Sequence, residues 1–332
     1  MLQNLLNQFL PLFFIVFLVT SLTAPYWIRK AKKAGLSGRD VHKKEEKQVA
    51  EMGGITVLLG FIIGIMLYIA MRIFILNADS KITPLLAIIV AVLIAGIIGI
   101  IDDILGWKIG LRQWQKPMLT LLVAFPIMAV DAGTRMMSFP LIGKVDLGLL
   151  YPLIVIPAFI LVGTNGFNML AGFNGLEAGQ GMIIHAALAY FTFTTGSAWL
   201  SVVALCMVAA LAGFYLFNYY PARLFPGDTL TYTVGALAAV IAIFANLEKV
   251  FIILFIPYII EFFLKLKGLF QKESFGKVQP DGTLINRYHN IYGLEHLVIK
   301  GFNLLRLKTT ERKVVYTLNG LQIVCVLLAM AI

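Results

Sequence analysis

The feature that most constrains this chain is a series of apolar runs, each long enough to cross a lipid bilayer. A helix of about 20 residues spans the hydrocarbon core. Of the 332 residues, 60% are hydrophobic and only 13% are charged, whereas a soluble domain is about half apolar and about a quarter charged. We therefore predict an all-α polytopic membrane protein that forms a single membrane-embedded domain over residues 1–332. Its ten predicted transmembrane helices lie near 8–28, 53–76, 84–101, 117–134, 147–163, 180–197, 199–218, 229–246, 249–266 and 314–332.

Lysine and arginine residues gather in alternate loops between these spans. With the loop after the first span on the cytoplasmic side, 22 of the 27 Lys and Arg residues fall in predicted cytoplasmic loops. Because cytoplasmic loops carry an excess of these residues, the N- and C-termini are both predicted to lie outside. The predicted cytoplasmic loops are 29–52, 102–116, 164–179, 219–228 and 265–313.

The net charge of +10 is explained by this asymmetry, so we expect anionic membrane lipid and a phosphorylated substrate as partners and no nucleic acid. The two cysteines, Cys206 and Cys325, lie in separate apolar runs and predict no disulfide framework. Phe9–Ile28 is long enough to span and is followed by no small-residue cleavage site, so we expect no cleavable signal.

One stretch between two apolar runs is polar and rich in glycine. Gly163–Gly181 reads GTNGFNMLAGFNGLEAGQG, with three asparagines, a glutamate and a glutamine. Unpartnered amides and carboxylates in hydrocarbon each cost several kcal/mol, so this stretch cannot face lipid. We predict a folded polar loop at a membrane face, in which glycines let the backbone approach a ligand closely. The alternative is a glycine-rich connector between helices.

Acidic and basic side chains stand at the mouths of the neighbouring spans. Asp102 and Asp103 follow the apolar run that ends at Ile101, and Lys116 begins the next span. Two carboxylates there are suited to divalent-metal or phosphate chemistry, and the lysine could reach an anionic ligand as a point charge. The alternatives are a hydrated helix end and a lysine that extends to the interface beside Trp114.

A third acidic residue, Asp228, opens the eighth predicted span in the word Phe225-Pro-Gly-Asp-Thr. An unpaired carboxylate at that depth is unfavourable unless it binds something, and Mg²⁺ prefers hard oxygen ligands. The alternative is a helix N-cap, for which aspartate is common. Phe225 could pack in the core or stack on a nucleobase. Glu51 begins the word EMGG at the entry to span two, where the glycine pair indicates close packing or ligand approach.

The predicted cytoplasmic loop 267–311 carries structure of its own. Its turn dipeptides between 267 and 296 predict a small strand or hairpin element. His296–Leu307 has apolar residues at helical spacing, which is typical of an amphipathic helix at the interface before the last span. Outside, a strand pair or turn is expected around Met137–Asp146.

Four sequence motifs occur in a distinctive order: GIIDDILGW, TNGFNMLAGFNGLEAGQG, PARLFPGDTL and TTERKVV. Together they resemble the polyprenyl-phosphate N-acetylhexosamine-1-phosphate transferase family, and most closely its archaeal and eukaryotic branch. The likeness covers most of the chain. It implies ten transmembrane helices and an active site on the cytoplasmic face, in agreement with the topology predicted from charge.

The resemblance also implies roles for single residues. It assigns Mg²⁺, with Mn²⁺ as a substitute, to Asn168 and Asp228. It assigns phosphate contact to Lys116, and a role in activating the lipid phosphate or organising the site to the acidic pair Asp102 and Asp103.

The same resemblance implies a uridine site in which Gly172 and Phe225 sandwich uracil and Asn174 hydrogen-bonds it. Glu51 is a further candidate substrate-binding residue. The sequence departs from the family in loop 267–296, where Arg287 and His289 are our candidates for contact with the sugar or phosphate. We expect loop 267–311 to act as a substrate-recognition insertion.

The activity implied is transfer of N-acetylglucosamine-1-phosphate from UDP-N-acetylglucosamine to a polyprenyl, dolichyl-type phosphate, with release of UMP. One alternative is the same chemistry with another UDP-N-acetylhexosamine for a cell-wall polymer. Another is a secondary transporter, which would place polar residues near the middle of the membrane rather than at one face. The resemblance favours an archaeal plasma membrane enzyme. The sequence leaves open the acetamido sugar, the lipid length and saturation, and the oligomeric state, a homodimer included. It also leaves open whether the product is used in protein N-glycosylation or in a cell-wall polymer.

Overall fold

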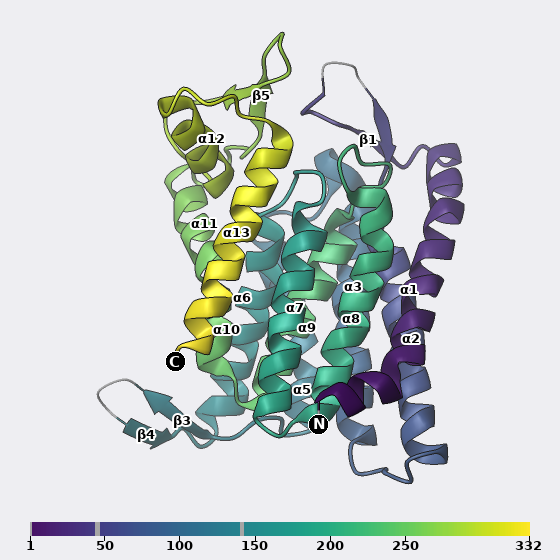
Figure 1. Cartoon of the computed structure of the whole chain (residues 1–332). Helices are drawn as coiled ribbons and strands as arrows, with labels where there is room; N and C mark the ends of the chain where they lie inside the picture. Colours follow the sequence, from purple (N-terminus) through teal and green to yellow (C-terminus); the bar gives the residue numbers. More distant parts are fainter. Residues whose placement is uncertain (1, 44–46, 140–142) are drawn as a thin grey trace.

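The computed structural model describes residues 2–43, 47–139 and 143–332, with side chains described for these residues except 2–6, 107–109 and 139. Long helices run side by side in one bundle, and short hairpins lie at its two ends (Figure 1). The long helices are α1 (Leu2–Lys33), α2 (Gly54–Phe74), α3 (Ile82–Ile109), α6 (Ile156–Met169), α7 (Leu176–Thr194), α8 (Ala198–Asn218), α9 (Gly227–Ala245) and α13 (Glu311–Met330).

Other helical segments are short or broken. The fourth predicted span is divided into α4 (Gln115–Thr120), the 3₁₀ turn η1 (Leu121–Ala124) and α5 (Phe125–Ala129). A π-helical turn, η2 (Tyr151–Val155), runs into α6. The ninth predicted span is divided into α10 (Glu248–Leu254) and α11 (Ile256–Lys267), and α12 (Leu294–Leu304) follows in the insertion.

Seven helices within the described residues are long and apolar enough to cross a membrane. The predicted integral, mostly helical membrane protein is therefore confirmed, while ten crossings stay a prediction. The remaining predicted spans are α7, which is less apolar, and the two broken segments. Proline accounts for the breaks, because Pro126 and Pro257 lack the backbone N–H that would continue a helix from the preceding turn.

Helix α9 is the centre of the bundle, because 89% of the residues in its 18-residue apolar stretch are buried. Small residues let its neighbours approach closely, as membrane helices commonly do. A Cβ atom on Gly235 would lie 2.1 Å from the Gly163 carbonyl oxygen of α6, and one on Gly99 of α3 would lie 2.5 Å from Thr229 Cα. The beginning of α9 is thus packed backbone to backbone against the helices that surround it.

Three antiparallel hairpins are found within the described residues. The predicted strand pairs are confirmed as β3 (Met136–Phe139) with β4 (Gly143–Asp146), and β5 (Gly276–Val278) with β6 (Leu284–Asn286). The hairpin of β1 (Ser37–Arg39) and β2 (Gln48–Ala50) was not predicted. The β1 and β5 hairpins lie at one end of the bundle, and β3–β4 lies at the other with the start of α1 and the end of α13 (Figure 1).

The predicted polar loop Gly163–Gly181 is wrong in its extent. Helix α6 continues to Met169 and α7 begins at Leu176, which leaves only 170–175 as a turn. These polar side chains can lie on helices inside the bundle, because neighbouring helices supply hydrogen-bond partners for them. Asn165 Nδ2 donates to Thr120 Oγ1 at 2.8 Å, and Gln180 Nε2 donates to Asn319 Oδ1 at 3.0 Å.

Candidate active site

A cavity of about 560 Å³ opens at the end of the bundle where the β1 hairpin lies. Helices α3 and α6 end there and α9 begins there, so residues far apart in the sequence meet in one place. Most of the residues predicted for the site line this cavity. They are Glu51, Asp102, Asp103, Lys116, Asn168, Gly172, Asn174, Phe225 and Asp228.

Asp103 fastens the first turn of α9 to α3. Its Oδ1 accepts a hydrogen bond from the Asp228 N–H at 2.7 Å, and its Oδ2 accepts from the Thr229 N–H at 3.0 Å and from Thr229 Oγ1 at 2.6 Å. The first N–H groups of a helix have no partner within it and carry partial positive charge, so a carboxylate is favourable there. Gly227 precedes them with φ of +71°, and a Cβ atom on it would lie 2.5 Å from Asp103 Oδ2. Asp103 and Gly227 together fix the position of Asp228.

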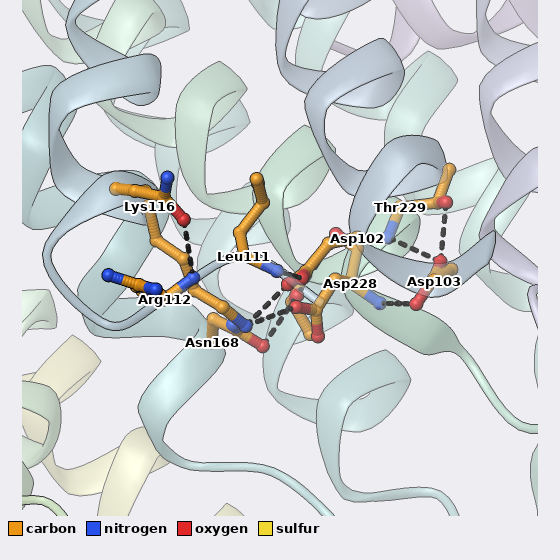
Figure 2. A network of polar contacts seen from close by, with 10 residues as sticks. Asp102, Asp103, Leu111, Arg112, Lys116, Asn168, Asp228 and Thr229 are labelled. Atoms are coloured by element: carbon orange, nitrogen blue, oxygen red, sulfur yellow. Dashed lines mark hydrogen bonds and ion pairs between the residues drawn. The ribbon is translucent and has the colours of Figure 1, made fainter. Parts of the chain in front are cut away.

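Asp102 faces the cavity with Lys116. The Lys116 ammonium forms ion pairs with Asp102 Oδ2 and, at 3.0 Å, with Asp228 Oδ2. The second oxygen of Asp102 accepts a hydrogen bond from the Leu111 N–H at 2.8 Å. Figure 2 shows that Lys116, from the first turn of α4, reaches toward the two carboxylates. The ammonium therefore stands as a cation between two anionic side chains.

Asn168 completes this half of the cavity from the last turn of α6. Its Oδ1 accepts a hydrogen bond from Thr231 Oγ1 at 2.9 Å, and Thr231 lies one turn after Asp228 on α9. The cavity thus offers a carboxylate and an amide carbonyl oxygen, which are the hard oxygen donors that Mg²⁺ prefers. The donor set fits this metal.

The other half of the cavity is formed by the turn 170–175 and its neighbours. Gly172 has φ of +107°, its N–H donates to Glu177 Oε1 at 2.7 Å, and a Cβ atom on it would lie 2.4 Å from the Phe275 ring. Asn174 Nδ2 donates to Asp40 Oδ2 at 2.9 Å. Phe225 is held by its backbone, since its N–H donates to the Ala50 carbonyl at 2.8 Å.

Glu51 also lines the cavity, just before α2. Burial raises the pKa of its carboxyl, and the nearby negative charge of Asp103 raises the pKa further. A carboxyl with a raised pKa is more readily protonated near neutral pH than an ordinary glutamate.

Arg287 and His289 do not line the cavity in this structure. Arg287 forms an ion pair with Glu273 on the surface of the insertion, and His289 is exposed. The insertion instead contributes Phe275 to the lining, beside Gly172. The sugar contacts proposed for Arg287 and His289 stay predictions.

Several residues of the site were not singled out as site residues from the sequence. Thr229 and Thr231 hold Asp103 and Asn168, and Asp40 holds Asn174. The two threonines lie in the word GDTLTYT, and polar residues inside an apolar span are a signal for buried hydrogen bonding.

Comparison with known proteins shows the family to which the chain belongs. A family model described as glycosyl transferase family 4 matches residues 85–246, which include both aspartate words and the Asn-rich stretch. A Saccharolobus solfataricus protein, named as a UDP-N-acetylglucosamine–dolichyl-phosphate N-acetylglucosaminephosphotransferase, is 34% identical over 290 residues, which cover 86% of either chain. The chain belongs to glycosyl transferase family 4. The resemblance found in the four sequence words is thereby confirmed.

Two further members of the family illustrate its range. A Sulfolobus acidocaldarius protein of the same printed name is 34% identical over 275 residues, which cover 81% of this chain and 80% of the relative. A Streptococcus thermophilus protein named phospho-N-acetylmuramoyl-pentapeptide-transferase is 30% identical over 259 residues, or 74% of either chain.

Proposed function

We propose that this protein transfers N-acetylglucosamine-1-phosphate from UDP-N-acetylglucosamine to a polyprenyl, dolichyl-type phosphate and releases UMP. The observation that carries the proposal is the meeting of Lys116, Asn168 and Asp228 in one cavity at the end of an apolar bundle. The relatives from Saccharolobus and Sulfolobus support the choice of sugar and lipid through their printed names.

In this reaction an oxygen of the lipid phosphate attacks the β-phosphorus of the UDP-sugar. The bond from that phosphorus to the bridging oxygen of UMP breaks, and UMP leaves with the electron pair. The nucleophile needs little activation, because a second phosphate pKa of about 6 leaves it mostly dianionic at neutral pH. The main difficulty is the approach of one anion to another, so positioning and charge neutralisation dominate.

The residues of the cavity have different roles in this positioning and charge neutralisation. The Lys116 ammonium exchanges Asp228 for phosphate oxygens, and it keeps its ion pair with Asp102, which holds it toward the cavity. Asp103 holds the first turn of α9, so that Asp228 keeps its position relative to Asn168. Asn168 and Asp228 would hold Mg²⁺, or Mn²⁺ in its place, and the ion would supply positive charge against the diphosphate.

The nucleotide occupies the other half of the cavity in this proposal. Gly172 and Phe225 take the faces of uracil, Asn174 takes its edge, and Glu51 contacts the substrate nearby. The insertion 267–311 acts in substrate recognition through Phe275, which already lies beside Gly172. Arg287 and His289 are on the same insertion and reach the sugar or phosphate only after it moves.

We place the chain in the plasma membrane, with ten crossings and the cavity on the cytoplasmic side. The bias of Lys and Arg toward the loops at the cavity end supports this orientation. The polar residues of the cavity gather at one end of the bundle, which favours a membrane-surface enzyme over a transporter with a site at mid-membrane.

A second candidate is the same reaction with another UDP-N-acetylhexosamine, as part of cell-wall polymer synthesis. The Streptococcus relative favours it, because its printed name describes transfer of a phospho-N-acetylmuramoyl pentapeptide. Both candidates use the same cavity and differ only in the sugar and in the step that consumes the product.

The experiment measures UMP release by the purified protein with Mg²⁺, using a panel of UDP-sugars with and without polyprenyl phosphate. We expect release only when both substrates are present, and fastest with UDP-N-acetylglucosamine. A different preferred sugar would favour the second candidate, and no UMP from any pair would overturn the transferase. Lys116→Gln should lower turnover at least about 100-fold, while the distant Lys81→Gln serves as a matched control.

A further inference from the structure

A buried polar cluster lies behind the wall of the cavity, on the side of the turn 170–175. It consists of Asp40, Lys43, Asn174 and Glu311, and we call it the Lys43 cluster. The Lys43 Nζ lies 2.6 Å from Glu311 Oε2 and 3.6 Å from Asp40 Oδ2. The side chains of Asp40 and Glu311 are only 4% and 3% exposed, so these interactions are shielded from water.

The cluster holds Asn174 through two of its donors. The Asn174 backbone N–H donates to Glu311 Oε1, and the side-chain Nδ2 donates to Asp40 Oδ2, both at 2.9 Å. Three segments meet in these contacts: the loop after α1, the turn before α7, and the first residue of α13. Neither Lys43 nor Glu311 lines the cavity, whereas Asp40 and Asn174 do.

The contact with Asp40 determines which atom of the Asn174 amide faces the ligand. An ionised carboxylate only accepts hydrogen bonds, so the amide must turn its NH₂ group toward Asp40. The carbonyl oxygen Oδ1 then points away from Asp40. In the part of the chain that the structure describes, no donor reaches this Oδ1. Asn174 lines the cavity, and its free carbonyl oxygen is not enclosed by protein, so the wall of the cavity offers a hydrogen-bond acceptor to a ligand.

An acceptor at this place distinguishes two pyrimidine bases. Uracil carries a hydrogen on N3 and would donate it to the Asn174 oxygen, whereas cytosine N3 has a lone pair and no hydrogen. Cytosine would therefore set two acceptors against each other in a partly buried site, which is unfavourable. A free NH₂ group at the same place would reverse this preference.

We propose that Asp40 is a positioning residue for base selectivity, which orients the Asn174 amide so that the site takes uridine and rejects cytidine nucleotides. Lys43 holds the Asp40 carboxylate in place, and Glu311 holds the backbone of Asn174. This inference rests on the proposed function, because it takes a uridine diphosphate-sugar as the substrate.

The test compares the dissociation constants of UDP and CDP for the purified full-length protein in detergent with Mg²⁺, by titration calorimetry. The variant is Asp40→Asn, whose amide can present either an oxygen or an NH₂ group to Asn174. We expect the wild-type protein to bind UDP at least about tenfold more tightly than CDP, and the variant to lose most of that ratio. Asp40→Asn should fold, because it leaves the Lys43–Glu311 ion pair intact and balanced in charge.

Two control variants separate orientation of the amide from general damage. Asp131→Asn removes an exposed carboxylate from its ion pair with Arg135, outside the cavity lining, and should keep the wild-type ratio. Glu311→Gln changes the contact with the Asn174 backbone N–H and not the contact with its side-chain amide. It should therefore weaken the binding of UDP and of CDP to a similar extent. A folded Asp40→Asn protein with the wild-type ratio of UDP to CDP binding would overturn the proposal.

A ligand-side measurement needs no variant. The wild-type protein should bind N3-methyl-UDP at least about tenfold more weakly than UDP, because the methyl group replaces the hydrogen that Asn174 accepts. Equal binding of the two nucleotides would overturn the inference even if Asp40→Asn failed to fold. Wild-type protein that binds UDP and CDP alike would refute the inference alone, whereas protein that binds no uridine nucleotide and releases no UMP would refute the proposed function with it.

Discussion

Asp102 and Asp103 are neighbours in sequence and have different tasks in the structure. Successive residues of a helix point about 100° apart, so Asp102 turns into the cavity toward Lys116 while Asp103 turns to the N–H groups of α9. A carboxylate that accepts three hydrogen bonds from another element has little freedom to take part in chemistry. Asp103 is therefore bound to the start of α9, whereas Asp102 is the member of the pair that is free to hold Lys116 in the proposed reaction.

The metal assignment predicts different outcomes for two substitutions at one position. Asp228→Ala removes an oxygen donor and should abolish turnover, whereas Asp228→Asn keeps a carbonyl oxygen and should retain a part of it at high Mg²⁺. The measurement is the UMP release rate as a function of Mg²⁺ concentration, with the exposed Asp79→Ala as control. Near wild-type turnover of Asp228→Ala at saturating Mg²⁺ would show that the metal is bound elsewhere.

The buried ring of His42 leads us to expect that the folded protein becomes less stable as the pH falls. Its ring is buried against Phe173, and burial lowers its pKa from 6.5 to about 4 although Asp40 opposes the shift. Between pH 6.5 and about 4 the unfolded chain therefore binds a proton that the folded protein does not, so stability falls as the pH falls through this window. The contribution is about 3 kcal/mol.

The measurement is the melting temperature in detergent at pH 7.5 and at pH 5. His42→Asn should show a smaller drop between the two than the wild-type protein, because asparagine does not titrate. His289→Asn, which changes an exposed histidine, should behave as the wild-type protein does. A drop that is unchanged by His42→Asn would assign the acid sensitivity to other groups.

Among the helices, α4 and α6 are connected by a hydrogen bond that lies about one helical turn away from their site residues. Asn165 precedes Asn168 by three positions on α6, and Thr120 follows Lys116 by four on α4. The hydrogen bond from Asn165 Nδ2 to Thr120 Oγ1, at 2.8 Å, ties the two helices together directly below Lys116 and Asn168. Because α4 is only six residues long, this tie determines where its lysine stands.

Asn165→Leu removes this hydrogen bond with a side chain that has the same branching and the same number of non-hydrogen atoms. We expect about a tenfold loss of kcat with little change in the KM for the nucleotide, because the lysine is misplaced while the uridine half of the cavity is untouched. Ser201→Ala is the matched control, since it breaks a buried hydrogen bond of similar length between Thr192 and Ser201, outside the cavity lining. Equal losses of kcat in both variants would show that Asn165 acts only through general stability.

For the molecule as a whole, the two ends of the bundle differ in chemistry. The cavity, the β1 hairpin and the insertion lie at one end, and the plain β3–β4 hairpin lies at the other with the start of α1 and the end of α13 (Figure 1). Lysine and arginine residues follow the same division. Because the end rich in Lys and Arg usually faces the cytoplasm, we expect the cavity on that side of the membrane.

Cysteine labelling in intact cells tests this orientation. The native cysteines Cys206 and Cys325 are buried, so single cysteines can be added to the unmodified chain. A membrane-impermeant maleimide should label Ser80→Cys, in the loop between α2 and α3 at the far end, without permeabilisation. It should label Lys277→Cys, on β5, only after the membrane is opened. The reverse pattern would place the cavity outside the cell.

Much of the site was predictable because its residues interrupt apolar sequence. Asp102, Asp228 and Asn168 stand out there, since a polar group beside lipid needs a partner or a ligand. Asp40 and Thr231 were missed as site residues because their partners lie 134 and 63 residues away and nothing local marks them. Arg287 and His289 were chosen because they are polar residues in the loop where the resemblance places the sugar contacts. The path of the insertion, which brings Phe275 to the cavity instead, has no local signal.

The sequence by itself determined that this chain is a helical membrane protein with its polar residues at one end, because hydrocarbon penalises every unpaired polar group and so forces a visible pattern of apolar runs. It also carried the family, through words whose order is distinctive. Only the tertiary structure decided which partner each polar group takes. Those choices depend on how closely α3, α6 and α9 approach, and the approach is set by glycines whose packing partners lie far away in the chain.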